Sequence, residues 1–160
     1  MFSLIITIVS IALVVALVAA TMYHGGDTLT QGRVTADAAA FVSGAQQVGG
    51  AATMYLSLEG SAPADVAALV TKSYLASAPV VKGTALALAT EVIGTKTVNT
   101  VESTVTSAAV CQQINKAAGI TAANTAAAGD TDSALVVVAN DLGNVAYGCL
   151  SASSQFTFKY

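Results

Sequence analysis

The sequence has few charged side chains, a single histidine and no tryptophan. Only 9% of its 160 residues are charged, compared with roughly 25% in soluble proteins, which disfavours a freely soluble enzyme with a highly charged surface. Six bases against nine acids, without a basic cluster, exclude the electrostatic surface that nucleic-acid binding needs. The 54% apolar content excludes intrinsic disorder. The many alanines and 13 glycines instead indicate close packing against copies of the same chain or against lipid.

Sequence motifs for catalysis or cofactor binding are also missing. The chain has no GxSxG motif and no glycine-rich phosphate loop after a predicted strand, so we expect no enzymatic activity, no cofactor and no metal ion. Asp130 and Asp132 form the one close acidic pair, which suits either calcium or, more simply, a solvated turn. Ser151, Ser153 and Ser154 are either glycan acceptors on an exposed loop or plain turn residues.

The first 23 residues form an apolar segment without charge, and the first charged side chain is that of Asp27. As a helix this segment would be roughly 35 Å long, enough to cross the hydrocarbon core of a bilayer. A cleaved secretory signal is the alternative, because small residues stand near its end at Val18 to Ala20. No Lys or Arg precedes the segment, and it is too long for a signal core. We therefore favour a retained transmembrane helix over residues 1–23.

Two adjacent glycines follow and predict a helix break near residues 24–27. Gly25 and Gly26 together would cost a helix about 2 kcal/mol relative to alanine, and Asp27 is a good N-cap residue. We therefore expect a kink or a locally unwound segment at this point of the chain.

An apolar stripe with heptad spacing comes next and predicts that the helix continues to about Leu58. Such a stripe packs the helix either on its own domain or on neighbouring subunits, and both can hold on different faces. Its large members lie seven residues apart and alanines stand between them: Val34, Phe41, Val48 and Tyr55, then Ala38, Ala45 and Ala52.

Residues 59–160 are predicted to form a small mixed domain. Turn residues after Glu59 end the long helix, and short helices are expected over residues 64–75, with Asp65 at the N-terminus, and over residues 110–118, stopped by Gly119. Residues 134–139 suit either a helix end or a buried strand.

Short strands complete this domain. Leucines, valines and threonines between residues 86 and 105 predict strands that are separated at Gly83, Gly94 and Asn99. Residues 155–160 alternate in the manner of an edge or terminal strand.

The two cysteines, Cys111 and Cys149, suit a disulfide formed in an oxidising compartment. Closing a loop of this length would stabilise the fold by roughly 3–4 kcal/mol. A pair of buried free thiols is the alternative. A metal site is disfavoured, because CxxC spacing is missing and the one histidine, His24, stands at the predicted membrane boundary.

The order of these parts, with several short stretches, resembles the type IV pilin family over essentially the whole chain. The stretches are Gln46–Gln47–Val48 with Ala51 to Tyr55 and Gly60, Leu69–Val70 with Tyr74–Leu75 and Pro79, and Cys111 to Lys116 with Tyr147–Gly148–Cys149 before Phe156 to Tyr160. The last group looks like the disulfide-bounded region of type IVb-like pilins. The resemblance implies an α+β fold, in which a long N-terminal helix (residues 1–58) packs against a small antiparallel-sheet head with short helices (residues 59–160).

The resemblance also implies a function. A major pilin polymerises through its apolar N-terminal helix into an extracellular pilus that serves adhesion, motility, DNA uptake or conjugation. Its precursor lies in the bacterial inner membrane and meets a prepilin peptidase and the pilus assembly machinery. Met1 would be the processed N-terminus, with methylation as a further implication. The residues that we expect in the filament core are Phe2, Leu4, Ile5, Ile8, Ile11, Ala12, Val15, Ala16 and Ala19.

One residue departs from the family pattern. Type IV pilins usually carry a glutamate at the fifth mature position, where it pairs with the N-terminal amine of a neighbour, and Ile5 stands there in this chain. A buried amine would then need another partner, and Ser3 and Thr7 are the polar side chains within reach. A minor pilin, a secretion-system pseudopilin and a membrane-anchored domain that never polymerises are therefore the alternatives.

Overall fold

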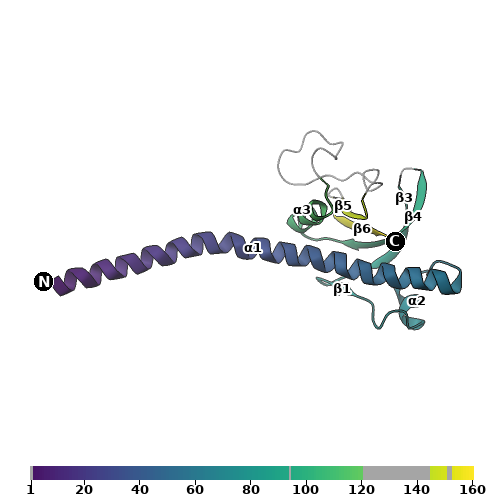
Figure 1. Cartoon of the computed structure of the whole chain (residues 1–160), viewed down its shortest axis with the longest axis horizontal. Helices are drawn as coiled ribbons and strands as arrows, with labels where there is room; N and C mark the ends of the chain where they lie inside the picture. The colour runs from purple at the N-terminus through teal and green to yellow at the C-terminus, as the bar shows by residue number, and fades with distance from the viewer. Residues whose placement is uncertain (1, 94, 121–144, 151–152) are drawn as a thin grey trace. The chain divides into compact units, whose positions relative to one another are not determined.

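The computed structural model describes residues 2–93, 95–120, 145–150 and 153–160. Its helices are α1 (Phe2–Glu59), α2 (Val66–Thr71) and α3 (Ala108–Ala117), and its strands are β1 (Val80–Val81), β2 (Thr84–Ala85), β3 (Ala87–Ile93), β4 (Lys96–Thr104), β5 (Tyr147–Leu150) and β6 (Gln155–Lys159) (Figure 1). The expected α+β layout, with a long apolar N-terminal helix and a small antiparallel sheet, is confirmed. The chain divides into two compact units, Met1–Val34 and Thr35–Tyr160, so that residues 35–59 of α1 belong to the head.

The long helix ends within one residue of its predicted end, but it does not unwind at Gly25 and Gly26. The backbone is helical throughout α1, including residues 24–27. Of the two alternatives predicted there, the locally unwound segment is wrong, and the kink stays a prediction. Glycine still makes the backbone hydrogen bond of a helix, and a cost of about 2 kcal/mol is small when long helical segments on both sides propagate the helix cooperatively.

The apolar stripe of α1 is buried in the head. Ala38, Phe41, Ala45, Val48 and Ala52 are each less than 4% exposed. The Phe41 ring lies 5.9 Å from that of Phe156 on β6. Packing on its own domain is therefore confirmed for this stripe, and the heptad spacing marks the face of α1 that carries the core.

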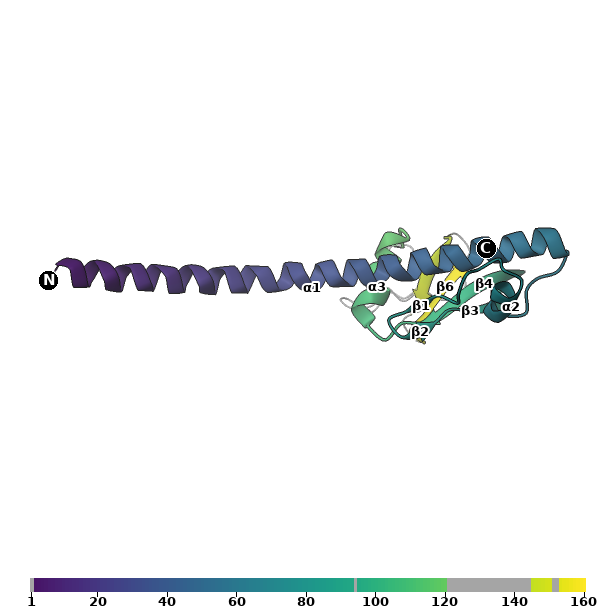
Figure 2. The ribbon, with the colours of Figure 1, turned by 90° about the horizontal axis from the view of Figure 1, so that it is seen from below.

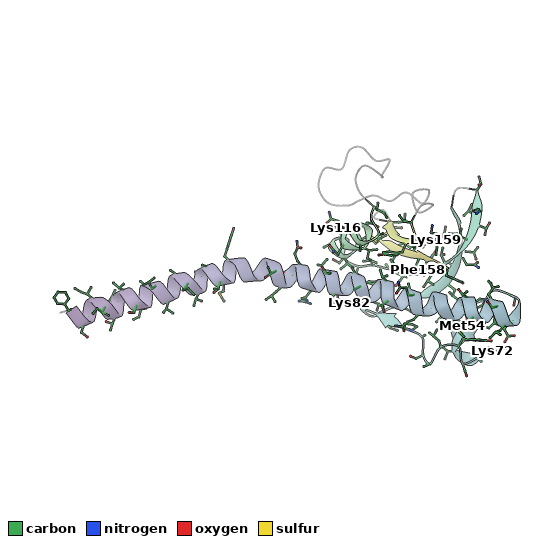
Figure 3. The ribbon with its side chains drawn as sticks, viewed as in Figure 1. Met54, Lys72, Lys82, Lys116, Phe158 and Lys159 are labelled. Carbon is green, nitrogen blue, oxygen red and sulfur yellow. A yellow bond between two sulfur atoms is a disulfide. The ribbon has the colours of Figure 1, made fainter. Side chains whose placement is uncertain are left out.

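Two groups of elements lie on opposite sides of this part of α1. The four-stranded sheet and α3 lie on one side, and the β1–β2 hairpin and α2 lie on the other (Figure 1; Figure 2). The hairpin is tied to α1 by an ion pair between Lys82 and Asp37 (3.0 Å), and α2 is tied to it by one between Lys72 and Glu59 (3.1 Å). Figure 3 shows Lys72 and Lys82 on the hairpin side, and Phe158 and Lys159 on the sheet side.

The main sheet is antiparallel, with the strand order β3-β4-β6-β5. Strand β6 is therefore interior: Phe158 pairs with Val101 on β4 and with Tyr147 on β5. Of the two positions predicted for residues 155–160, the edge position is wrong, and the terminal one is confirmed, because β6 is the last described strand of the chain. The alternation of apolar and polar residues predicted one solvent-exposed face, but both faces of β6 are buried at its centre. Phe156 contacts Phe41 of α1 on one face, and the polar Thr157 is buried on the other.

The strand boundaries agree in part with the predictions. Gly83 lies in the two-residue turn between β1 and β2, as expected. Asn99 is not a separator, because β4 runs through it and pairs it with Thr90. Gly94 and residues 134–139 lie outside the described residues.

The two short helices have clear sequence signals at their ends. Asp65 caps α2 by accepting a hydrogen bond from the Ala68 backbone N–H at 2.7 Å, although α2 is shorter than the predicted 64–75. Helix α3 ends at Ala117, and the φ of 78° at Gly119 permits hydrogen bonds from Gly119 N–H to the Lys116 carbonyl and from Ile120 N–H to the Asn115 carbonyl. Ile120 then packs against Val98, Ala118, Val145 and Leu150.

Candidate functional site

The first unit presents an apolar surface that the described residues of the chain leave exposed. Every residue expected in the filament core is exposed, from Phe2 at 86% to Ile5 at 57% among the large ones, with Ala12, Ala16 and Ala19 exposed between them. Among the described residues there is one helix, α1, that is long enough and apolar enough to cross a membrane, judged by length and composition alone. Such a surface is stable in water only when lipid or protein covers it.

Three hydroxyl side chains in this segment bond to the helix itself. Thr7 donates to the Leu4 carbonyl at 2.9 Å, Ser10 to the Ile6 carbonyl at 2.8 Å, and Thr21 to the Val18 carbonyl at 2.9 Å. Each hydroxyl proton is therefore satisfied without an external partner. The polar residues within the apolar segment do not prevent it from entering an apolar environment.

The N-terminus itself is only partly visible. Met1 lies outside the described residues. Ile5 is exposed and offers no charge. Thr7 uses its proton on Leu4 and keeps its oxygen lone pairs as acceptors for an ammonium group.

The head is closed by the disulfide between Cys111 on α3 and Cys149 on β5, with the two Cα atoms 5.3 Å apart. The disulfide prediction is confirmed. Both cysteines are buried, at 4% and 0% exposure. Cys149 lies in β5, which is an edge strand of the sheet, so the cross-link fastens α3 across that edge.

Asn115 holds the same strand, and the sequence analysis did not single it out. It is fully buried, its Nδ2 donates to the Cys149 carbonyl at 2.9 Å, and its Oδ1 accepts from the Cys149 N–H at 2.7 Å. An asparagine four residues after a cysteine in a short helix is the available signal, since both then share one helix face.

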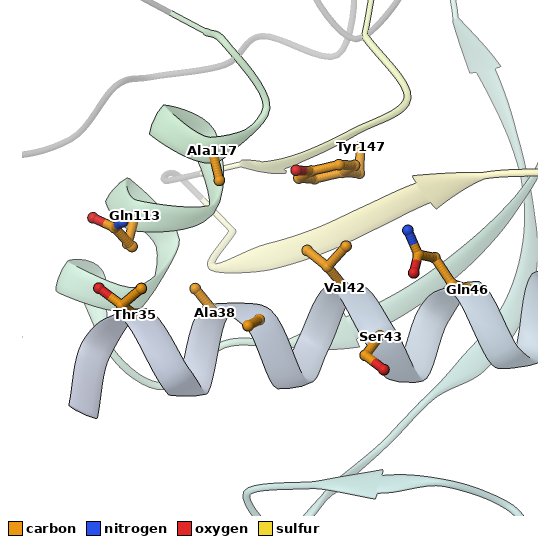
Figure 4. A pocket seen from close by; sticks show the side chains of 9 residues that line it. Thr35, Ala38, Val42, Ser43, Gln46, Gln113, Ala117 and Tyr147 are labelled. Carbon is orange, nitrogen blue, oxygen red and sulfur yellow. The ribbon is translucent and has the colours of Figure 1, made fainter. Parts of the chain in front are cut away.

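A pocket of about 270 Å³ lies between α1, α3 and β5. Its floor is formed by residues of α1 between Thr35 and Gln46, and Gln113, Ala117 and Tyr147 form the opposite wall (Figure 4). The lining contains amide and hydroxyl groups but no charged side chain. This pocket also escaped the sequence analysis, because its walls come from segments far apart in the chain.

Two carboxyl groups meet on β3 and β4. Glu102 accepts hydrogen bonds from Thr100 Oγ1 (3.1 Å) and from Gln155 Nε2. Burial raises the pKa of Glu102 and the charge of Glu91 on β3 raises it further, while the hydrogen bonds from Thr100 and Gln155 oppose this rise. We assign Glu102 a structural role, because its carboxylate accepts hydrogen bonds from Thr100 and Gln155, which belong to the same sheet.

Other charged groups in the head have simple roles. The pKa of the exposed Lys72 is raised by its hydrogen bond to Glu59 and by the charge of that residue. Burial lowers the pKa of Lys159 and raises that of Tyr160.

The described residues hold no group of three or more His, Cys, Asp or Glu side chains that could bind a metal ion. Asp130, Asp132 and Ser151 lie outside the part of the chain that the structure describes. Ser153 and Ser154 form the turn before β6, in agreement with the plainer of their two interpretations. No protein-family model, curated protein or solved structure matches the chain.

Proposed function

We propose that this chain is a structural subunit, a major pilin, that polymerises through the apolar first part of α1 into an extracellular filament. The observation that carries the proposal is the division of one helix between two tasks. Residues 2–23 expose their apolar side chains, whereas the stripe from Ala38 to Ala52 is buried as the spine of a small cross-linked head.

The exposed segment supplies a large driving force for assembly. Twelve large apolar side chains from Phe2 to Val18 are at least half exposed. Burying such a side chain fully yields about 1.5–3 kcal/mol, so the segment as a whole has on the order of 20–35 kcal/mol to gain by leaving water. A bilayer satisfies this demand before assembly, and a bundle of identical helices satisfies it afterwards.

The composition of the segment favours helix bundling. Without a hydrophobic gain between lipid and protein, helices associate in membranes through close van der Waals packing at small residues. Ala12, Ala16 and Ala19 are exposed on α1 at spacings of four and three residues. Ser10 and Thr21 bond to their own helix, which leaves the contact surface free of unpaired hydroxyl protons.

The apolar first part of α1 and the disulfide support a proposed compartment for each stage of assembly. The precursor is held in the bacterial inner membrane by α1, the head oxidises outside the cytoplasm, and a prepilin peptidase and the assembly machinery deliver the subunit into the pilus. Because Ile5 replaces the usual glutamate, the N-terminal amine pairs with oxygen acceptors instead. Ser3 and Thr7 of adjacent helices are the hydroxyl groups that stand near it.

The first experiment is electron microscopy of material sheared from the surface of cells, with mass spectrometry of its main protein and of that protein's N-terminus. Fibres composed chiefly of this chain are expected, with an N-terminus at Met1. If the chain stays in the inner-membrane fraction and no fibre contains it, the proposal fails and a membrane-anchored domain is the better description. Its presence in a short periplasmic fibre would indicate a pseudopilin.

A substitution tests the packing argument. Ala16→Trp should abolish filaments, because a large ring at a small-residue contact keeps neighbouring helices apart. The head should remain folded, with the Cys111–Cys149 disulfide formed, since Ala16 belongs to the other unit. Leu17→Trp is the matched control, because a large side chain already stands there and the added volume is smaller. Filaments of normal yield from Ala16→Trp would contradict the proposed bundle.

A further inference from the structure

The contact between Asn115 and Cys149 reproduces the hydrogen bonding of a neighbouring strand. A primary amide side chain carries one carbonyl acceptor and an N–H donor, as a backbone peptide does. Asn115 directs this pair at the N–H and C=O of a single residue, with distances of 2.7 and 2.9 Å. The open edge of β5 is thereby closed at Cys149, the residue that carries the disulfide.

The position of Asn115 on α3 gives this contact a second consequence. Cys111 and Asn115 are four residues apart, so they project from the same face of the helix. Both are buried, and both engage Cys149: one through sulfur and one through the two hydrogen bonds. The hydrogen bonds need no oxidation. They join Asn115 to the backbone of Cys149, not to its sulfur atom.

We propose that Asn115 is the positioning residue for disulfide formation in this protein: it docks Cys149 against α3 before the cross-link exists and so raises the effective concentration of the two thiols. The reaction with oxidised glutathione is a thiol–disulfide exchange. One cysteine thiolate attacks the glutathione disulfide and releases one glutathione thiolate. The second cysteine thiolate then attacks the mixed disulfide and releases the other. Two cysteine thiols are oxidised, and one glutathione disulfide is reduced to two glutathione thiols.

Thermodynamic linkage separates this role from ordinary stabilisation. A residue that stabilises the oxidised and reduced heads equally leaves the thiol–disulfide equilibrium unchanged. Loss of Asn115 affects the two forms unequally. In the oxidised head the cross-link keeps the N–H and C=O of Cys149 buried without partners, whereas in the reduced head the strand can separate from α3 and hydrate them. The oxidised form therefore bears the larger penalty.

The test is a glutathione redox titration of the full-length protein in detergent, with the oxidised fraction measured by thiol alkylation and mass spectrometry. Asn115→Leu, similar in size but unable to hydrogen-bond, should lower the equilibrium constant for disulfide formation by about tenfold or more. Gln112→Ala is the matched control, because it removes a half-buried amide next to Cys111 and should change the constant by less than about twofold.

A second variant provides the test if Asn115→Leu does not fold. Asn115→Asp keeps the size and the acceptor for the Cys149 N–H, but its ionised carboxylate cannot donate to the Cys149 carbonyl, so the constant should again fall. An equilibrium constant equal to that of the wild type in either folded variant would overturn the proposal. The result is independent of filament formation, because the titration reads only the head.

Discussion

Two adjacent glycines of α1 provide a sharp test of how the helix packs in the head. Gly49 is buried, and a Cβ atom built on it would lie 3.1 Å from Tyr160 Cβ and 3.2 Å from Phe158 Cε1. Gly50 is exposed, and a Cβ atom there would meet nothing within 4 Å. The two positions share one helix and one residue type, so they differ only in what surrounds them.

Alanine at either position gains about 1 kcal/mol of helix propensity. For Gly50→Ala this gain is the whole effect, and we expect the free energy of unfolding to rise by about 1 kcal/mol. Gly49→Ala also forces the C-terminal residues of the sheet away from the helix, and such overpacking costs about 1–3 kcal/mol. Its free energy of unfolding should therefore be unchanged or fall by up to about 2 kcal/mol.

The assay is guanidinium unfolding of the full-length protein in detergent, followed by near-ultraviolet circular dichroism of the tyrosines. Four of the five tyrosines belong to the unit Thr35–Tyr160, so this signal reports on the head rather than on the first part of α1. A difference of 1 kcal/mol corresponds to about 3–5 °C in Tm for a domain of this size. Equal shifts of the same sign for both alanine variants would refute the close approach of β6 to α1.

Two further predictions concern the cross-link and the carboxyl pair. Replacing Cys111 and Cys149 together by alanine should lower the free energy of unfolding by roughly 3–4 kcal/mol, measured as the change in guanidinium midpoint, and a loss below about 1 kcal/mol would contradict the loop-closure argument. Because the folded-state pKa of Glu102 is raised above 4.5, the folded head binds its proton more tightly than the unfolded chain does, and stability should fall as pH rises through the folded-state pKa. Glu102→Gln should reduce this fall above pH 4.5, and a urea series with an unchanged pH dependence would show that another group causes it.

The sequence predicted those parts of the fold that depend on local or periodic signals. The heptad stripe identified the buried face of α1, Asp65 marked the start of α2, and Gly119 marked the end of α3. Each of these signals acts through neighbours within one or two helical turns. The cysteine pair was predictable for a different reason, because two cysteines have one way to pair with each other.

Features that depend on contacts between distant segments were not predicted. The interior position of β6 is set by its pairing with both β4 and β5, and no local pattern in residues 155–160 encodes those partners. The double hydrogen bond of Asn115 also joins residues 34 positions apart. At Gly25 and Gly26 a local signal predicted unwinding that does not occur. The local cost of the two glycines is outweighed by the cooperativity of a 58-residue helix.

The interior place of β6 has a kinetic consequence. Strand β4 has β6 as its neighbour on one side, and β5 joins the sheet only through β6. During synthesis, the described sheet therefore cannot close until residues 155–159 have emerged, long after α1 is complete. Because non-local strand pairing is slow, the head waits in an open state in which Cys149 is accessible to folding catalysts and proteases. A delay in the synthesis of β6 thus lengthens the exposure of every earlier strand.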